Sequence, residues 1–429
     1  MSEVINVPDG WELKLSSELC NKIADGTHDT PKPSFFGFKL ITSKNLKDNR
    51  LDFEDCYLIS KEDYTNINKR SQVNQYDILF GMIGTIGNPV IVLDKKIQFS
   101  IKNVGLFKFN GNYELSKWFY YYLTSENFNQ YLDFILSGSS QKFVSLGMLR
   151  TLPILIPKDK KEQEKIAKIL STLDTVIEST QKLIDKEKNI KKGLMTDLLQ
   201  NGIDKNGKIR TPQTHKYKDS ELGLIPEEWK VIKLKECAII RNSNVDKKTL
   251  ENEISIKLCN YMDVYVNDEI DFSIEFMNAS ATEDEINKFL IKEGDVIITK
   301  DSESPDDIGI PSYVSENFQD VICGYHLTMI RPKKGCNGKF LSLLLQSEYH
   351  KKYFGRLASG STRFALSLGT ISNTLILLPA IEEQKQISKI LNSQDEKIEK
   401  EEENLAKLKE LKKGLMNDLL SGKVRVKIK

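Results

Sequence analysis

The fold of this chain is decided by the stretch KEQEKIAKILSTLDTVIESTQKLIDKEKNIKKGLM, residues 161–195. Apolar residues recur along it every three to four positions with mostly charged or polar residues between them, the pattern of a helix that packs along one edge. From Ile166 to Leu194 the helix is about 42 Å long at 1.5 Å per residue. The predicted seam is Ile166, Ile169, Leu173, Val176, Thr180, Leu183, Glu187, Ile190 and Leu194, and Ile177 and Ile184 are also expected to pack.

A second stretch of this kind runs over residues 381–420. Its stripe is Ile387, Ile390, Leu391, Ile398, Leu405, Leu408, Leu411 and Leu415, and Gln394, Lys397 and Glu401 make it less regular. A long helix with one apolar edge needs a partner surface in water. We favour antiparallel packing of the two helices within the chain over a coiled coil between two chains.

The helices belong to a larger repeat. Pro8-x-x-Trp11 returns as Pro226-x-x-Trp229, an offset of 229 − 11 = 218, and Lys-Gly-Leu-Met at residues 192–195 returns at 413–416, an offset of 221. Asp77-Ile78 likewise returns as Asp295-Val296. The chain is therefore a tandem duplication of a domain plus a connector, which suggests a two-part ligand.

Each half is predicted to be α+β, with a strand-rich body followed by helices. Runs rich in β-branched and aromatic residues predict the strands, at 38–42, 77–82, 89–93 and 104–109 in the first half and 254–258, 295–299 and 325–330 in the second. Predicted helices follow at 115–123 and 128–136, and at 339–345 and 349–357. The expected divisions are domains at 1–157 and 216–379, long helices at 158–200 and 380–421, a linker at 201–215 and a basic tail at 422–429.

Composition is that of a globular protein: of 429 residues, 39% are hydrophobic and 29% are charged. The formal net charge of +1 is unlike the strongly basic balance of an isolated nucleic-acid binder, so any basic surface must be local. The six cysteines include no Cys-x-x-Cys, which argues against zinc and a disulfide framework. No leader or long apolar run is evident, so we expect a soluble cytoplasmic protein.

Several polar loops are candidate contact sites. Asp25 to Pro31 forms a predicted tight turn that presents Thr27 and His28, side chains suited to hydrogen bonds with base edges and phosphates. Gly138 to Phe143 pairs with Gly360 to Phe364, and each segment carries a cation, Lys142 or Arg363, beside small hydroxyl residues. A helix cap with a solvated cation explains these segments as well.

Two segments are candidates for a catalytic site. Gly81-x-x-Gly84-Thr85-x-Gly87 has neither of the established phosphate-loop spacings. The second half has Lys300 and an acidic stretch with Glu303, Asp306 and Asp307 there, which leaves a metal site as an alternative. No methylase or Walker motif is present, so the chain is expected to do no chemistry alone.

Taken together, these segments resemble the specificity subunit of type I restriction-modification systems. The resemblance rests on Asp25-Gly26-Thr27-His28, Thr42-Ser43-Lys44-Asn45, the two Gly-Ser loops, the segment 220–229, and helices that begin with Glu-Gln at 162 and 383. It covers essentially the whole chain. It implies two target-recognition domains, each reading one half of a bipartite asymmetric DNA site, and antiparallel helices that set the spacer.

The resemblance also implies partners. Two methyltransferase subunits would dock on the helices, and restriction-translocase subunits would join for cleavage. S-adenosylmethionine, Mg and ATP are expected on those partners, with no cofactor or metal in this chain. The expected DNA contacts are Thr27, His28, Lys44, Lys142, Arg363 and Lys300. The alternatives are a self-sufficient metal-dependent DNA endonuclease and a coiled-coil scaffold without a DNA role.

Overall fold

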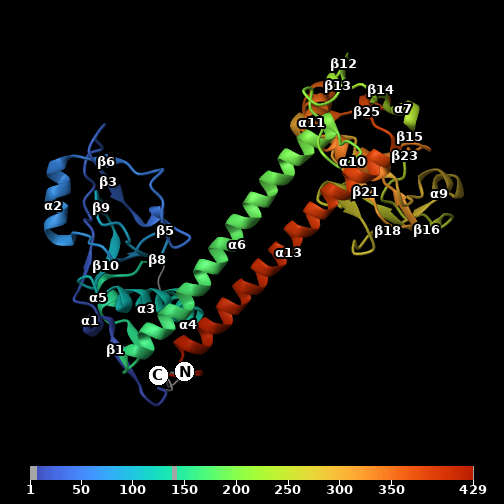
Figure 1. Ribbon diagram of the computed structural model, residues 1–429. Coiled ribbons are helices and arrows are strands. Elements are labelled where there is room, and N and C mark those ends of the chain that lie inside the picture. Colours follow the sequence, from blue (N-terminus) through green and yellow to red (C-terminus); the bar gives the residue numbers. More distant parts are fainter. Residues whose placement is uncertain (1–6, 138–142, 429) are drawn as a thin grey trace. The chain divides into compact units, whose positions relative to one another are not determined.

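The computed structural model describes residues 7–137 and 143–428. The chain forms two compact units (Figure 1). The first contains the residues up to Lys182 together with those from Glu402 onward, and the second contains Leu183–Glu401. Each of the two long helices therefore contributes one half of its length to each unit. None of the helices in the described ranges is both long and apolar enough to cross a membrane.

The first unit is built on two sheets. The larger has four antiparallel strands in the order β2 (Lys22–Asp25), β10 (Val104–Lys108), β7 (Ile78–Gly81) and β8 (Gly87–Ile91). The smaller has the order β6 (Leu58–Ile59), β3 (Phe38–Ile41) and β9 (Phe99–Ile101), with β3 parallel to β9. The other elements are β1 (Trp11–Leu15) paired with β11 (Pro153–Pro157), β4 (Leu46–Lys47) paired with β5 (Arg50–Leu51), α1 (Ser16–Leu19), η1 (Ser43–Asn45), α2 (Lys61–Ser71), α3 (Tyr113–Thr124), α4 (Glu126–Leu136) and α5 (Leu146–Arg150).

The second unit has the same two kinds of sheet. One follows the order β15 (Ala238–Asn242), β23 (Leu327–Pro332), β19 (Val296–Thr299), β21 (Pro311–Val314) and β17 (Glu269–Ile270), and the other β18 (Met277–Ala281), β16 (Ile254–Cys259) and β22 (Val321–Cys323). The remaining elements are β14 (Lys230–Lys233) with β25 (Leu375–Leu378), β12 (Tyr217–Ser220) with β13 (Gly223–Pro226), β20 (Asp301–Ser302) with β24 (Phe364–Ala365), α7 (Leu234–Cys237), α8 (Tyr261–Tyr265), α9 (Glu283–Phe289), η2 (Pro305–Asp307), α10 (Gly338–Leu345), α11 (Glu348–Leu357) and α12 (Leu368–Ser372).

The strand orders confirm the duplication and the α+β class. β2-β10-β7-β8 corresponds to β15-β23-β19-β21, and β6-β3-β9 corresponds to β18-β16-β22. In both small sheets the pair at one edge, β3 with β9 and β16 with β22, is parallel.

One repeated aspartate shows why the frame is retained. Asp77 is buried just before β7, accepts a hydrogen bond from the Asn74 backbone N–H (2.8 Å), and pairs with the Lys108 ammonium (2.8 Å). Asp295 stands just before β19 and pairs with Arg331 at 2.6 Å. A buried carboxylate without such a cation is strongly destabilising, so both halves keep the pair.

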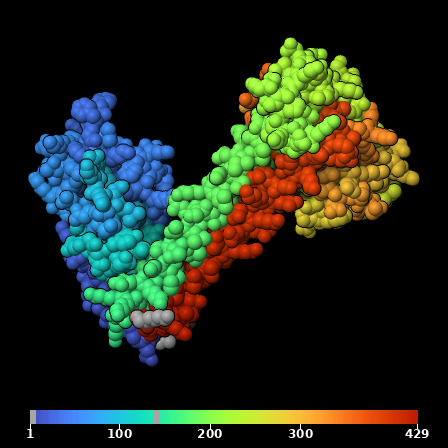
Figure 2. Space-filling model, in the orientation of Figure 1, coloured from blue at the N-terminus to red at the C-terminus, as the bar shows by residue number. Residues whose placement is uncertain are grey.

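The two long helices are α6 (Lys160–Asn201, 42 residues) and α13 (Ile381–Leu420, 40 residues). They lie side by side in Figures 1 and 2 and run antiparallel. In the first unit Lys412 pairs with Asp174 (2.6 Å), and in the second Lys191 pairs with Asp395 (2.5 Å). The helix ends also join the domain cores, since Ile166 and Met416 pack in the core that contains Trp11.

The predicted seam is out of phase at some positions. Ile166, Leu173, Ile184, Ile387, Ile398 and Leu405 are buried, and Ile169, Ile177, Leu194, Ile390 and Leu415 are half-buried. Ile190 and Leu411 are 39% and 53% exposed, so their expected place in the seam is wrong. Lys191 and Lys412 are half-buried next to them, because their ammonium groups find carboxylates on the other helix while their stems pack.

Both helix starts are held by an arginine from the segment that follows the other helix. Arg425 donates from Nε and Nη2 to Glu162 at 2.6 and 2.7 Å, and Arg210 donates from Nη1 and Nη2 to Glu383 at 2.5 and 3.2 Å. The Trp229 indole N–H also donates to Glu383 (3.3 Å). We call each Arg–Glu pair a helix-start clamp. Arg210 in the expected linker and Arg425 in the expected basic tail are therefore engaged in structural ion pairs.

Candidate nucleic-acid interface

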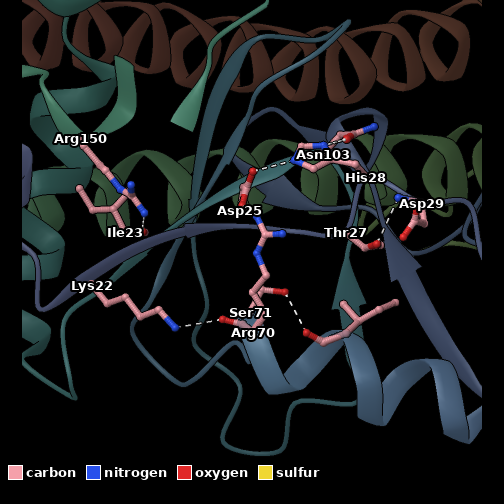
Figure 3. Close-up of polar contacts among 11 residues, drawn as sticks. Lys22, Ile23, Asp25, Thr27, His28, Asp29, Arg70, Ser71, Asn103 and Arg150 are labelled. Atoms are coloured by element: carbon pink, nitrogen blue, oxygen red, sulfur yellow. Dashed lines mark hydrogen bonds and ion pairs between the residues drawn. The ribbon is translucent and has the colours of Figure 1, made fainter. Parts of the chain in front are cut away.

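The turn that follows β2 is organised around one buried carboxylate. Asp25 ends the strand and accepts hydrogen bonds from Arg70 on α2 and from His28 Nε2, the latter at 2.9 Å (Figure 3). Gly26 lies so close to β9 that an added Cβ would be 2.3 Å from the Ile101 carbonyl oxygen. The close approach therefore admits only glycine, and it fixes the residues that follow.

His28 and Thr27 are both placed by this turn. The other ring nitrogen of His28, Nδ1, lies 2.9 Å from the Asn103 side-chain oxygen, and the His28 side chain is 58% exposed. Thr27 Oγ1 accepts a hydrogen bond from the Asp29 N–H at 3.2 Å (Figure 3). Both imidazole nitrogens of His28 have protein partners, so the surface that it exposes is its ring face and edge. The imidazole also positions Asn103 and Asp25.

Lys44 reaches the same place from another loop. It lies in η1, and the neighbouring Ser43 hydroxyl donates to the Asn103 carbonyl oxygen (3.1 Å) and accepts from the Met82 N–H (3.2 Å). The Lys44 side chain is exposed and forms no ion pair within the described residues. Asn103 therefore links the predicted contact residues His28 and Lys44, which are distant in sequence.

Phe143, which follows the Gly-Ser segment of the first half, is joined to the same region. Ile83, which follows Met82, forms a β-bridge with Phe143. Lys142 itself lies outside the described residues, so its predicted contact stays a prediction. In the second half β20 pairs with β24, where Ser302 is opposite Phe364, and Arg363 immediately precedes that strand with an exposed side chain.

Lys300 lies at this second site but is held by the protein. Its ammonium donates to the Ser243 carbonyl oxygen (3.2 Å) and lies 4.3 Å from the centre of the Tyr325 ring. Burial lowers the pKa of Lys300. Its neighbour Asp301 pairs with His326 at 2.9 Å. Lys300 therefore supports the loop, and its expected DNA contact stays a prediction.

The residues that organise the two sites were missed by sequence reasoning. Asn103 immediately precedes β10 and His326 immediately precedes β23, so they occupy equivalent positions. The strand correspondence could have located that position, but its role depends on His28 in one unit and Asp301 in the other. No sequence signal links Asp25 to Arg70, since the two are 45 residues apart.

The metal interpretation finds no geometric support. Asp307 Oδ2 accepts a hydrogen bond from the Tyr265 hydroxyl (2.5 Å), and the Asp306 N–H is bonded to Ser304. Within residues 7–137 and 143–428 no three metal-ligating side chains form a group that could hold an ion. The polar loops are suited to hydrogen bonding and phosphate contact.

Comparison with known proteins agrees with the repeated architecture. The family model described as the type I restriction modification DNA specificity domain matches twice, at residues 8–188 and 226–410. The type I restriction enzyme MjaVIII specificity subunit of Methanocaldococcus jannaschii is 30% identical over 367 residues, covering 84% of this chain and 82% of that protein. The putative MjaX specificity subunit of that organism is 26% identical and covers 99% and 96%.

Solved structures support the fold. A type I restriction-modification system S subunit from M. genitalium aligns with a TM-score of 0.55 at 16% identity, covering 100% of this chain and 99% of that one. A chain from a study of complex assembly and conformational transition of the type I R-M system aligns with a TM-score of 0.56 at 15% identity, covering 98% and 100%. With both copies of the domain matched, this chain belongs to the family of type I restriction-modification specificity subunits.

Proposed function

We propose that this chain is the DNA-recognition subunit of its complex, with target-recognition domains at 1–157 and 216–379 that each read one half of a bipartite asymmetric site. One observation carries the proposal. In each unit the residue before the central strand, Asn103 or His326, is held by a polar loop, but a different loop does so: the turn after β2 with Asp25 and His28 in the first, and the segment after β19 with Lys300 and Asp301 in the second. A shared frame with unlike loops is what two different half-sites require.

The helices are proposed to set the spacer and to dock two methyltransferase subunits. Ile190 and Leu411 support the docking, because they are both exposed and lie at equivalent positions, 411 − 190 = 221. The same apolar side chain position on each helix suits two copies of one partner. Those partners bind S-adenosylmethionine and flip an adenine, since chemistry on a base requires its removal from the stack. Restriction subunits join when cleavage is needed.

The first test is a methylome comparison. We expect deletion of this gene to remove one split adenine-methylation motif from the source cell, and plasmid-borne wild type to restore it. An unchanged methylome would contradict the proposal.

Lys44→Ala and Arg363→Ala then assign the contacts in the purified methyltransferase complex. If either residue contacts phosphate, the variant should lower the slope of log K against log salt by about 0.9 without changing site preference. If either reads a base, preference should relax at one position instead. Lys95→Ala, an exposed lysine outside these loops, is the matched control.

A further inference from the structure

The two long helices can be aligned by their own ion pairs. Asp174 pairs with Lys412 in the first unit, and Asp395 pairs with Lys191 in the second. The positions correspond, since 395 − 174 = 221 and 412 − 191 = 221. A residue of α6 therefore has its counterpart 221 positions later in α13.

One cluster around a buried carboxylate breaks this correspondence. Glu187 is 5% exposed, and its carboxylate accepts hydrogen bonds from Gln394 Nε2 and Lys397 Nζ, each at 2.7 Å. Gln394 also approaches the Glu187 carbonyl oxygen at 3.3 Å. The hydrogen bond from Lys397, and then that from Gln394, lowers the pKa of Glu187, so the carboxylate stays charged at neutral pH. We call these three residues the polar trio.

The counterparts of the polar trio are apolar. Adding 221 to 187 gives Leu408, and subtracting 221 from 394 and 397 gives Leu173 and Val176. Leu173 is buried, Leu408 is half-buried and Val176 is 41% exposed. The seam is thus polar at this layer in the second unit and apolar at the corresponding layer in the first.

This difference matters only when a helix meets the wrong partner. If α6 paired antiparallel with α6 of another molecule in the same register, Glu187 would face Leu173 and Val176. In a pair of two α13 helices, Gln394 would face Leu408. A buried polar group that loses its partner is strongly destabilising. Isolated polar residues in a helical seam are known to fix which helices pair.

The two flanking ion pairs do not discriminate in this way. In a pair of two α6 helices, Asp174 would still meet a lysine, because Lys191 is the α6 counterpart of Lys412 (412 − 221 = 191). The same holds for Asp395 and Lys412 in a pair of α13 helices. The contacts of the polar trio, by contrast, would be lost in like-with-like pairs.

We propose that Glu187, Gln394 and Lys397 are pairing determinants, which permit α6 to pack on α13 and penalise α6–α6 and α13–α13 pairing between molecules. The consequence is that each assembly contains one copy of each recognition domain. The proposal concerns helix pairing and does not depend on which DNA is read.

The linker joins the two helices of one chain and gives them a high effective concentration, which favours intrachain pairing whatever the seam contains. The test therefore cuts the linker. A protease site is inserted after Gln213, in an exposed turn beyond Arg210, so that each piece keeps one residue of each type in the helix-start clamps. The full chain is purified, cut, unfolded in urea and refolded with all residues present. Circular dichroism checks that each variant regains its helicity.

Thr180→Cys reports like-with-like pairing. The residue pairs 173–187, 176–187 and 174–191 place the centre of an α6–α6 pair between positions 180 and 183. Thr180, which is buried in the seam, therefore lies near its own copy, and oxidation links the two pieces. Cys56→Ser removes the one described cysteine that is not buried. Covalent dimers of residues 1–213 are then counted on non-reducing gels.

Three seams are compared. The unmodified seam should give almost no dimer. E187L/Q394L/K397V makes both layers apolar, and with no difference in affinity about half of the 1–213 pieces should cross-link. The matched control adds L408E, L173Q and V176K to those three, which moves the trio to the other unit and should restore low cross-linking. Equal cross-linking in the unmodified and apolar seams, or no rise in the apolar seam, overturns the proposal.

Discussion

Asp25 and Asp301 are carboxylates that hold the candidate contact loops of their own units. Asp25 binds His28 and Arg70, and Asp301 binds His326. The turn at Thr27 and His28 was foreseeable, because its Gly and Pro mark a bend. Its partners were not, because Asn103 is brought to His28 by the pairing of β10 with β2, across 75 residues.

The two aspartates allow reciprocal variants. Asp25→Asn should loosen His28 and Arg70, cost about 1 to 2 kcal/mol in the free energy of unfolding because a buried partner is removed, and relax only one half of the methylated motif. Asp301→Asn should relax only the other half. Urea titration measures the first effect and methylome sequencing the second. Loss of specificity in both halves from either variant would contradict separate reading.

At the scale of the element, the helices show what periodicity can and cannot give. Their existence and their apolar edge were predictable, but the predicted edge included Ile190 and Leu411 in place of the lysines that follow them. Hydropathy ranks Lys191 below Ile190, yet Lys191 packs its stem and reaches Asp395. The local spacing of apolar residues does not reveal a partner carboxylate on a helix that is distant in sequence.

The exposed pair Ile190 and Leu411 yields an element-scale prediction. I190E/L411E should prevent co-purification of the methyltransferase subunits while helicity is retained, because a charge cannot be buried against an apolar partner surface. Leu183→Glu is the matched control, since Leu183 is also exposed but its counterpart 221 residues later is Asn404. If L183E and the double variant weaken assembly equally, the docking face lies elsewhere.

At the scale of the whole molecule, the duplication could be recognised in the sequence because the repeated residues have structural roles. Asp77 and Asp295 each hold a cation, and Glu162 and Glu383 each hold an arginine in a helix-start clamp. The small strands and α2 escaped prediction, since they are short or mainly polar and gain their stability from neighbours. The match between sheets was therefore visible in the sequence only through a few fixed residues.

If the helices set the spacer, their length should determine the number of base pairs between the two half-sites. Removing 177–183 and 398–404, which correspond by the 221-residue offset, shortens each helix by about 10 Å and should shorten the methylated spacer by roughly three base pairs. Both half-site sequences should stay unchanged. Removing only one segment is the control, and it should destabilise the pair. An unaltered spacing in the double deletion would contradict the proposal that the helices set the spacer.

The composition of the first unit has a consequence for synthesis. Its core includes Met416, Leu419 and Leu420, and Arg425 holds its helix start, so the last part of the chain completes the first domain to emerge. At 5 to 20 residues per second, the ribosome needs roughly 10 to 45 s to make the intervening residues. During that interval the leading half of α6 packs on its own domain but lacks the cover that α13 later provides. Nascent chains on one messenger thus meet each other with the α13-facing surface of α6 bare.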